Sequence, residues 1–150
     1  MLITKIQWLG IILLLLLLGC SKSIVQTKLI TFDVNLNANN NSPIALDVVI
    51  LYDEALVEQL ISLSAKQWYE KREQFKRDYP AILHTWEWEV VPGQVIPFFK
   101  IPENTKKAKG ALIFANYHSP GLHRARIDPY QGVIVRLLEY EFVVQPLVRK

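Results

Sequence analysis

The sequence predicts a mainly β protein: an antiparallel β-sandwich with a small helical insert between its second and third strands. Three observations lead to this prediction. Several segments alternate apolar and polar residues with a period of two, turn residues separate these segments at regular spacing, and only residues 54–78 have a helical period. Because strands and helices do not alternate along the chain, we expect two packed sheets and not an α/β fold.

The first two strands are the clearest. The first is predicted over residues 30–36, where every second residue is apolar and gives one buried face; these residues are Ile30, Phe32, Val34 and Leu36. Residues 44–52 are apolar on both faces apart from Asp47, which predicts a central strand or one that helices cover. Between them, residues 37–43 read Asn-Ala-Asn-Asn-Asn-Ser-Pro and predict a loop, because asparagine tolerates left-handed backbone.

The helical insert has its own start and stop signals. Asp53 can cap a helix that begins at the next residue, and Ser64 with Gln67 forms a capping box for a second helix. Pro80 ends the second helix, because proline lacks the backbone N–H that a helix needs. The insert is therefore predicted as two helices.

The second of these helices is predicted to be amphipathic. Its apolar side consists of Ala65, Trp68, Phe75 and Tyr79. The charged residues from Lys66 to Asp78 predict a solvent-exposed face, on which Glu73 and Arg77 form a favourable pair one turn apart.

The rest of the chain is predicted as strands joined by turns. The predicted segments are 85–91, 94–101, 111–117, 122–127 and 131–144. Pro97 makes the second of these an edge strand or a broken one, and the last segment is long enough for one long strand or a bent pair. A basic loop is expected over residues 103–110.

Residues 1–19 have the pattern of a secretory signal peptide. Lys5 precedes an apolar run of about 12 residues, which is shorter than the roughly 20 needed to span a bilayer. The tetrad Leu17-Leu18-Gly19-Cys20 resembles the lipobox of bacterial lipoproteins. The resemblance implies cleavage before Cys20, the only cysteine, and covalent lipid on that residue. An ordinary cleaved signal peptide with an incidental cysteine and an uncleaved anchor are the alternatives.

The predicted mature chain starts with this lipid anchor. Residues 20–28 are expected to tether a single domain, residues 29–150, and the eight residues after Cys20 reach at most roughly 28 Å when fully extended. Ser21 is not the aspartate that favours retention of bacterial lipoproteins at the inner membrane. We therefore expect attachment to the outer membrane, facing the periplasm.

The composition argues against several kinds of partner. Without the signal peptide, basic residues exceed acidic ones by only two, and no basic stripe with interleaved aromatic residues is present. This balance favours neither nucleic acid nor an anionic membrane surface. Because the sequence has no glycine-rich phosphate or dinucleotide motif, we expect no cofactor and no small-molecule substrate.

The histidines form no recognised catalytic or metal-binding motif. His84, His118 and His123 each lack a second histidine ligand three or four residues away. His118 and His123 flank one turn, which leaves a two-histidine metal site as an alternative to ordinary surface histidines. Ser119 lies beside His118, but without the glycine-flanked elbow that presents a nucleophilic serine.

Residues 86–89 raise two further alternatives. Glu87 and Glu89 share one face of a strand, and paired carboxylates can perform acid–base chemistry on sugars, although a solvated strand face is the commoner arrangement. Trp86 and Trp88 share the other face and predict either a carbohydrate platform or part of the core. Because neither pair comes with a further catalytic motif, we expect no enzymatic activity.

The order of these parts resembles the TssJ (SciN) family, the outer-membrane lipoproteins of type VI secretion systems. Four features carry the resemblance: the lipobox that ends at Cys20; the polar stretch 36–43 with its Ser-Pro, followed by a strand that ends in Val49-Ile50-Leu51-Tyr52; the helical insert directly after Tyr52; and the turn Pro92-Gly93-Gln94, followed by an apolar strand at 111–117 and a short basic strand at 123–127. The resemblance extends over nearly the whole mature chain.

The resemblance implies a structural role. The family has a transthyretin-like β-sandwich with a helical addition, and its members hold the periplasmic domain of the inner-membrane protein TssM in a complex that also contains TssL. The loop between the first two strands is important for that contact. In this sequence the loop comprises Asn37, Ala38, Asn39, Asn40, Asn41, Ser42 and Pro43.

This loop offers hydrogen bonds but no large apolar side chain, whereas interfaces draw most of their energy from a few large residues. We therefore expect an apolar anchor from a neighbouring loop, with Pro120, Leu122 and His123 as candidates. The alternative function is that of an envelope lipoprotein whose sandwich binds carbohydrate through Trp86 and Trp88.

Overall fold

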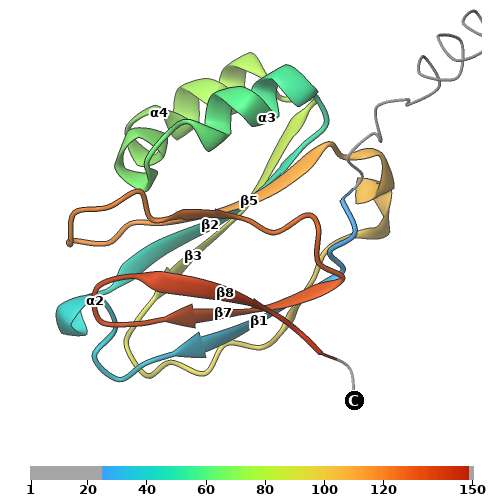
Figure 1. Cartoon of the computed structure of the whole chain (residues 1–150). Coiled ribbons are helices and arrows are strands. Elements are labelled where there is room, and N and C mark those ends of the chain that lie inside the picture. The colour runs from blue at the N-terminus through green and yellow to red at the C-terminus, as the bar shows by residue number, and fades with distance from the viewer. Residues whose placement is uncertain (1–24, 149–150) are drawn as a thin grey trace, which may run out of the picture.

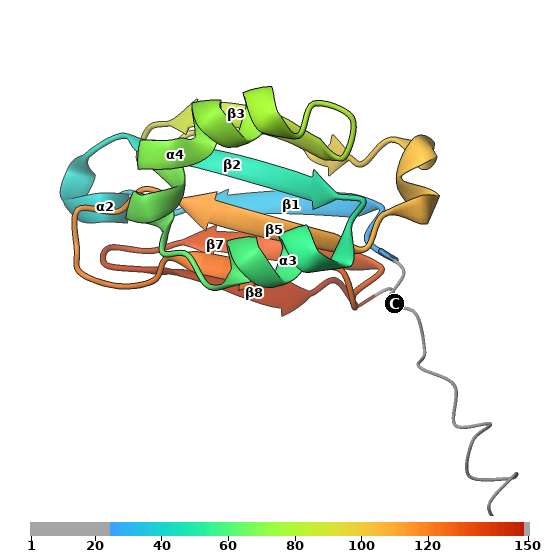
Figure 2. The same cartoon turned by 90° about the horizontal axis from the view of Figure 1, so that it is seen from above.

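Two four-stranded sheets pack face to face, and two helices cover the outer face of one of them (Figures 1 and 2). The structure, a computed structural model, describes residues 25–148. The predicted signal peptide and Cys20 lie outside the described residues. The predicted fold class, a mainly β sandwich with a helical insert between the second and third strands, is confirmed.

The strand order shows how the sheets are built. The first sheet contains, in order, β4 (Phe99–Lys100), β1 (Leu29–Val34), β7 (Gly132–Leu137) and β8 (Phe142–Pro146). The second contains β3 (Leu83–Val90), β2 (Ile44–Leu51), β5 (Gly110–Ala115) and β6 (Arg124–Arg126). The pairings between described strands are antiparallel except that of β1 with β7, which is parallel. The chain between β1 and β7 passes through the other sheet, so no local turn sets their relative direction.

The core between the sheets contains the inward-facing residues of the alternating strands. Ile30 and Phe32 of β1 are buried, as are Leu46, Val48 and Ile50 of β2. β2 lies between β3 and β5, as its two apolar faces predicted. Burial of each large aliphatic side chain contributes about 1.5–3 kcal/mol relative to exposure, so this core holds the two sheets together.

Trp86 and Trp88 of β3 face this core. The ring centroid of Trp88 lies 5.7 Å from that of Phe32 and 5.2 Å from that of Phe99. The Trp86 ring lies 5.3 Å from Phe99. The two rings are therefore half-buried among aromatic neighbours and pack against the core, which favours the core role over a carbohydrate platform.

β1 is shorter than the alternation predicts. It ends at Val34, and Leu36, predicted on the buried face, is 78% exposed. The reason is a turn at Asn35, whose side-chain oxygen accepts the Asn37 N–H at 3.1 Å and whose carbonyl accepts the Gly93 N–H at 3.1 Å. The chain thus leaves the sheet before it reaches Leu36.

The helical insert consists of α3 (Glu54–Ile61) and α4 (Ala65–Asp78), and both begin at the predicted caps. Asp53 Oδ1 accepts the Leu56 N–H at 2.9 Å, and Ser64 and Gln67 form both hydrogen bonds of the capping box. Both helices lie over the second sheet (Figure 2). Their apolar sides form a second core with outward-facing strand residues, which includes Val49, Leu51, Leu56, Leu60, Trp68, Phe75, Leu112 and Phe114.

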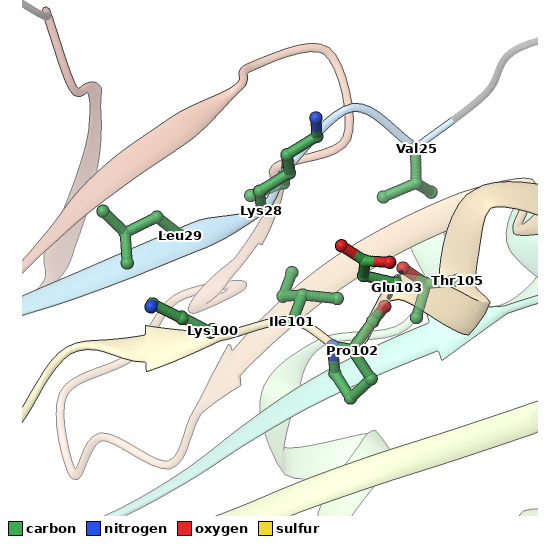
Figure 3. Close-up of a pocket in the computed structure, with 9 residues that line it drawn as sticks. Val25, Lys28, Leu29, Lys100, Ile101, Pro102, Glu103 and Thr105 are labelled. Carbon is green, nitrogen blue, oxygen red and sulfur yellow. Dashed lines mark hydrogen bonds between the residues drawn. The ribbon is translucent and has the colours of Figure 1, made fainter.

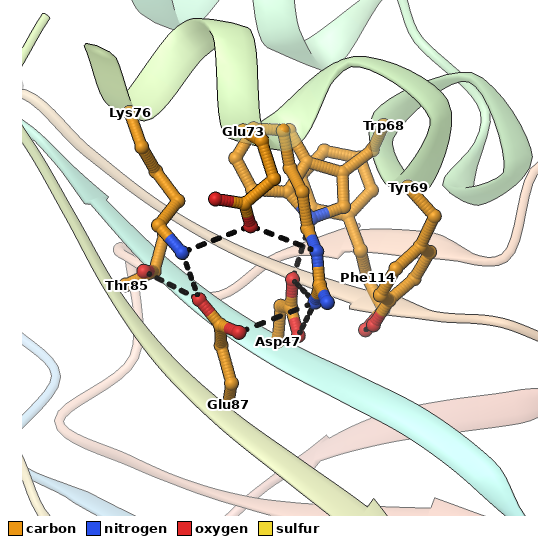
Figure 4. A network of polar contacts seen from close by, with 9 residues as sticks. Asp47, Trp68, Tyr69, Glu73, Lys76, Thr85, Glu87 and Phe114 are labelled. Carbon is orange, nitrogen blue, oxygen red and sulfur yellow. Dashed lines mark hydrogen bonds and ion pairs between the residues drawn. The ribbon is translucent and has the colours of Figure 1, made fainter.

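A polar network also fixes α4 on the sheet (Figure 4). Asp47, 1% exposed on the outer face of β2, accepts hydrogen bonds from Trp68 Nε1 at 2.8 Å and Arg72 Nη1 at 3.0 Å. Glu87 lies directly opposite Asp47 on β3 and is 3.4 Å from Arg72. Because like charges directly opposite on paired strands repel, the guanidinium between them is what makes this arrangement stable.

Lys76 completes the network on the solvent side. Its Nζ lies 2.8 Å from Glu87, and this hydrogen bond lowers the pKa of the Glu87 carboxyl. Burial instead raises the pKa of Asp47, although its carboxylate accepts hydrogen bonds from α4. The network therefore combines one buried carboxylate with one that is partly open to water.

The charged side of α4 is only partly solvated, in contrast to the prediction. Arg72 and Lys76 turn toward the sheet, where two carboxylates attract them. In place of the predicted pair between Glu73 and Arg77, Glu73 contacts Lys76 at 3.0 Å and Arg72 at 3.6 Å, while Arg77 donates a hydrogen bond to Gln74. Helical spacing alone did not reveal these partners on the sheet.

The C-terminal half follows the prediction with differences in length. Segment 94–101 contains only the short edge strand β4, as Pro97 indicated, and the predicted basic loop contains the 3-10 helix η1 (Glu103–Lys107). The final segment is a bent pair, β7 and β8. Within the part of the chain that the structure describes, no helix is long and apolar enough to cross a membrane.

Residues 25–28 belong to the domain, although they were predicted as part of the tether. Val25 and Thr27 are buried. The Val25 N–H donates to the Ala108 carbonyl at 3.4 Å, and Thr27 Oγ1 donates to the Tyr130 carbonyl at 2.7 Å. The side chains of Gln26 and Lys28, which suggested a tether, are indeed exposed, but their backbone N–H groups donate to the carbonyls of Asp128 and Gln131 and so dock the segment.

The predicted tether is therefore shorter than residues 20–28. Four residues separate Cys20 from Val25, a span of about 17 Å at full extension. Residues within 25–148 supply two apolar cores, as a domain that folds as a unit requires, and we expect this stretch to fold on its own.

Candidate partner-binding end

The predicted partner loop and the docked N-terminal segment lie at opposite ends of the sandwich (Figure 1). Residues 25–28 enter beside the start of β7, where the Lys28 N–H donates to the Gln131 carbonyl at 2.9 Å. The loop between β1 and β2 lies where β1 ends. It contacts two other loops there, and we call residues 35–43, 116–123 and 138–141 together the distal loop cluster.

The asparagine-rich loop contains a short helical turn, α2 (Ala38–Asn41), with unusual backbone. Asn39, Asn40 and Asn41 all have positive φ, at 49°, 53° and 60°. Left-handed backbone costs most residues roughly 1–2 kcal/mol, and asparagine tolerates it better than most. The run of three asparagines is thus explained by three consecutive left-handed positions.

Asn39 joins the three loops of the cluster. Its side chain is buried: Nδ2 donates to the Pro43 carbonyl at 3.0 Å, and Oδ1 accepts the His118 N–H at 2.8 Å. Its backbone N–H donates to the Leu138 carbonyl at 3.1 Å, and the next N–H, of Asn40, donates to the Glu139 carbonyl at 3.2 Å. The Asn39 side chain therefore fixes a loop roughly 80 positions away, and the backbone N–H groups of Asn39 and Asn40 fix one roughly 100 positions away.

The seven predicted contact residues divide into two groups. Asn37, Asn40, Asn41 and Pro43 are exposed, and Ser42 is half-buried. Ala38 and Asn39 are fully buried, so they support the loop and have no surface to offer a partner. The part of the loop that a partner can reach is therefore a strip of exposed amides.

The second loop of the cluster, residues 116–123, is held by its own side chains. The Ser119 hydroxyl donates to the Tyr140 carbonyl, and His123 Nε2 donates to the Ser119 carbonyl at 2.8 Å. The Tyr117 ring stacks on His123 with centroids 4.9 Å apart. His123 is thus committed to the loop and is not an exposed anchor, in contrast to its predicted role.

A groove of about 490 Å³ lies between this loop and the start of β8, lined by residues 119–124 and 140–142. Two large apolar side chains stand exposed beside it, Leu122 at 56% and Tyr140 at 58%. Leu122 was predicted as an anchor, whereas Tyr140 was not, because nothing local in the sequence places it beside the asparagine loop. The Glu139 carboxylate next to it raises the pKa of the Tyr140 hydroxyl.

The catalytic and metal-binding alternatives gain no support from the geometry. In the described residues, no group of three or more histidine, cysteine, aspartate or glutamate side chains is placed to hold a metal ion. Glu87 is held by Lys76 and Thr85, and its pKa is lowered, whereas a catalytic general acid requires a raised pKa. Glu87 therefore serves the network under α4.

Two solved structures have a similar fold. A crystal structure of the type VI secretion system lipoprotein TssJ1 from Pseudomonas aeruginosa matches with a TM-score of 0.61 at 13% sequence identity, over 83% of this chain and 99% of TssJ1. The structure of Serratia marcescens Lip, a membrane-bound component of the type VI secretion system, matches with a TM-score of 0.57 at 13% identity, over 80% of this chain and 96% of Lip. No protein-family model and no curated protein sequence matches the chain.

These matches confirm, at the level of fold, the resemblance that the sequence predicted. They cover nearly the whole length of TssJ1 and of Lip, so the sandwich and its helical insert are shared as a unit and not as isolated strands. The chain therefore has the fold of the TssJ-type lipoproteins of type VI secretion systems.

Proposed function

We propose that this protein is an outer-membrane lipoprotein of a type VI secretion system and that its distal loop cluster holds the periplasmic domain of TssM, in a complex that also contains TssL. The observation that carries the proposal is the match of the whole fold to two lipoproteins of that system. The docked N-terminal segment, which follows the proposed anchor in the sequence, lies at the opposite end of the sandwich from the loops and supports the proposal.

The proposed anchor determines where the distal loop cluster can reach. Lipid on Cys20 holds the docked segment within about 17 Å of the membrane. The distal loop cluster then faces away from that membrane, toward the periplasm. A protein rooted in the inner membrane would meet this end of the domain first.

The surface of the distal loop cluster suits a protein partner. Leu122 and Tyr140 supply exposed apolar area, while Asn37, Asn40 and Asn41 supply amides for hydrogen bonds around it. Interfaces combine such apolar or aromatic anchors with a polar rim. The cluster contains two glutamates, whereas the neighbouring Arg124, which also lines the groove, is half-buried and donates through Nε to the Leu63 carbonyl, so the exposed charge favours a neutral or basic surface on the partner.

Tyr140→Ala is expected to weaken binding of the TssM periplasmic domain by about 30-fold, as loss of an aromatic hot spot does. The measurement is biolayer interferometry with residues 25–150 of this chain and the TssM domain from the same organism. Tyr130→Ala is the matched control, because Tyr130 is also exposed but lies at the other end, beside the docked segment. If Tyr130→Ala weakens binding as much as Tyr140→Ala does, the contact is not at the distal loop cluster. If the wild-type domain does not bind at micromolar concentration, the proposed function fails.

Asn39→Ala is expected to lower the stability of the domain by about 2 kcal/mol and to weaken TssM binding, because the partly buried hydrogen bonds to the His118 N–H and the Pro43 carbonyl are lost. Urea unfolding measures the first effect and interferometry the second. Asn40→Ala is the control, since Asn40 shares the left-handed backbone but has an exposed side chain. Equal losses of stability and binding from both substitutions would show that the left-handed backbone, and not the buried Asn39 side chain, determines the stability and binding of the loop.

A further inference from the structure

Lysines gather at the end of the sandwich where the N-terminal segment is docked. Segments 25–28 and 99–109 contain five lysines and a single acidic residue, Glu103. The distal loop cluster, at the opposite end, contains two glutamates and no basic residue apart from histidine. The small net charge of the chain thus conceals a difference in charge between these two sets of segments.

Backbone hydrogen bonds hold these lysines on one surface. Leu29 pairs with Lys100 between β1 and β4, and the Ile101 N–H donates to the Lys28 carbonyl at 3.0 Å. The Val25 N–H donates to the carbonyl of Ala108, directly after Lys107. We call Lys28, Lys100 and Lys107 the basic collar.

The collar lysines are not used within the domain. All three are exposed, and no carboxylate of the described residues lies within 4 Å of their ammonium groups. Lys109, by contrast, pairs with Glu54 at 3.7 Å. The one described contact is that of Lys100 with the exposed ring of Phe98, at 5.6 Å from its centroid. Three unpaired cations on a fixed surface can therefore attract an external anion.

A cavity of about 480 Å³ opens beside the collar, between the docked segment and β4 (Figure 3). Lys28 and Lys100 stand at its edge, and apolar side chains including Leu29 and Ile101 line its walls. Glu103 is the one acidic residue among the lining residues. Apolar walls with an ammonium edge match the boundary between lipid headgroups and acyl chains, where lysine places its charge in the headgroup layer.

We propose that the basic collar is a membrane-contacting surface that binds the headgroups of anionic phospholipids. The short stretch between Cys20 and Val25 favours phospholipid headgroups as the ligand of the collar, because a lipid on Cys20 leaves this end of the domain next to the bilayer. Tyr130, 36% exposed and hydrogen-bonded through its carbonyl to Thr27, adds an aromatic ring of the kind found at membrane interfaces. The inference rests on the proposed lipid attachment for its orientation, but the charge attraction itself requires no lipid on Cys20.

The test uses residues 25–150, which form a folding unit without the lipid, and vesicles of phosphatidylcholine with or without phosphatidylglycerol. We expect co-sedimentation with the anionic vesicles at low salt, little with pure phosphatidylcholine, and loss of binding in about 1 M salt, where charges are screened. Lys100→Gln with Lys107→Gln should weaken binding about 25-fold, or fivefold per lysine. The matched control, Lys66→Gln with Lys71→Gln, removes the same charge from the exposed side of α4 and should change binding less than twofold.

Two outcomes overturn the inference. One is failure of the folded wild-type domain to bind the anionic vesicles. The other is an equal loss of binding from both pairs of substitutions, which would mean that the total charge of the domain, and not the collar, attracts the vesicles. Thermal melting of each variant confirms that it is folded. Palmitate labelling of the full chain separates this result from the proposed function. If the full chain is acylated but the collar does not bind anionic vesicles, this inference fails and the proposed anchor stands. If the chain is not acylated but the collar binds, the proposed anchor fails and this inference stands.

Discussion

Cys20→Ser is expected to detach the protein from the membrane and abolish type VI secretion, while the domain stays folded and still binds the TssM periplasmic domain. Serine has no thiol to acylate, so the mature chain loses the proposed anchor. Headgroup attraction by three lysines does not replace it, since stable anchoring requires two membrane signals of which at least one is an acyl chain. The two cores consist of residues within 25–148, and serine differs from cysteine by a single side-chain atom, so folding is expected to survive.

Membrane fractionation, palmitate labelling and a secretion assay measure these effects, and urea unfolding confirms the unchanged domain. Ser21→Ala is the matched control, because it changes the neighbouring residue and keeps the thiol. If the serine variant remains in the outer-membrane fraction, the lipid is not the anchor. If it is released and secretion continues, attachment to the outer membrane is not needed for the proposed function.

Local features of the fold could be predicted from the sequence because local physics determines them. The period of two placed Leu46, Val48 and Ile50 in the core, and the capping box at Ser64 marked the start of α4. The left-handed backbone at Asn39 is also a local property that the residue type indicates. In each case the feature depends on residues a few positions away in the sequence, or only on whether a side chain is apolar.

The missed features depend on residues far apart in the sequence. Asn39 is buried because His118 and Leu138 come to it, and the tether is short because Ala108 and Tyr130 bind residues 25–28. The collar has the same origin, since Lys28 precedes β1, Lys100 ends the β4 strand that pairs with it, and Lys107 ends η1. Composition counts charges but does not show where the fold brings them together.

The short tether changes how the proposed anchor works. A free segment of eight residues would let the domain tilt and turn, whereas a docked Val25 leaves only a short stretch before Cys20. If the collar also contacts headgroups, the domain has two attachments to the membrane and a preferred orientation. The distal loop cluster is then presented at a defined height, which reduces the orientational cost of meeting a partner from the opposite membrane.

Asp47→Ala is expected to lower the free energy of unfolding by about 3 kcal/mol, because it leaves the buried Trp68 indole N–H without an acceptor and removes the ion pair with Arg72. For a domain of this size the midpoint of thermal unfolding should fall by about 10 °C. Urea unfolding followed by tryptophan fluorescence measures the change directly.

Asp47→Asn is the control that separates the hydrogen bond from the charge. The asparagine carbonyl can still accept from Trp68, and burial of a charge, which raises the pKa of Asp47, is no longer required. Arg72 keeps Glu87 as a partner at 3.4 Å, so we expect a loss of only about 1 kcal/mol. Equal losses from the alanine and asparagine variants would show that the ion pair holds α4 on the sheet. A negligible loss from both would show that the apolar contacts of Trp68 with Phe114, at 5.0 Å between ring centroids, are sufficient without the network.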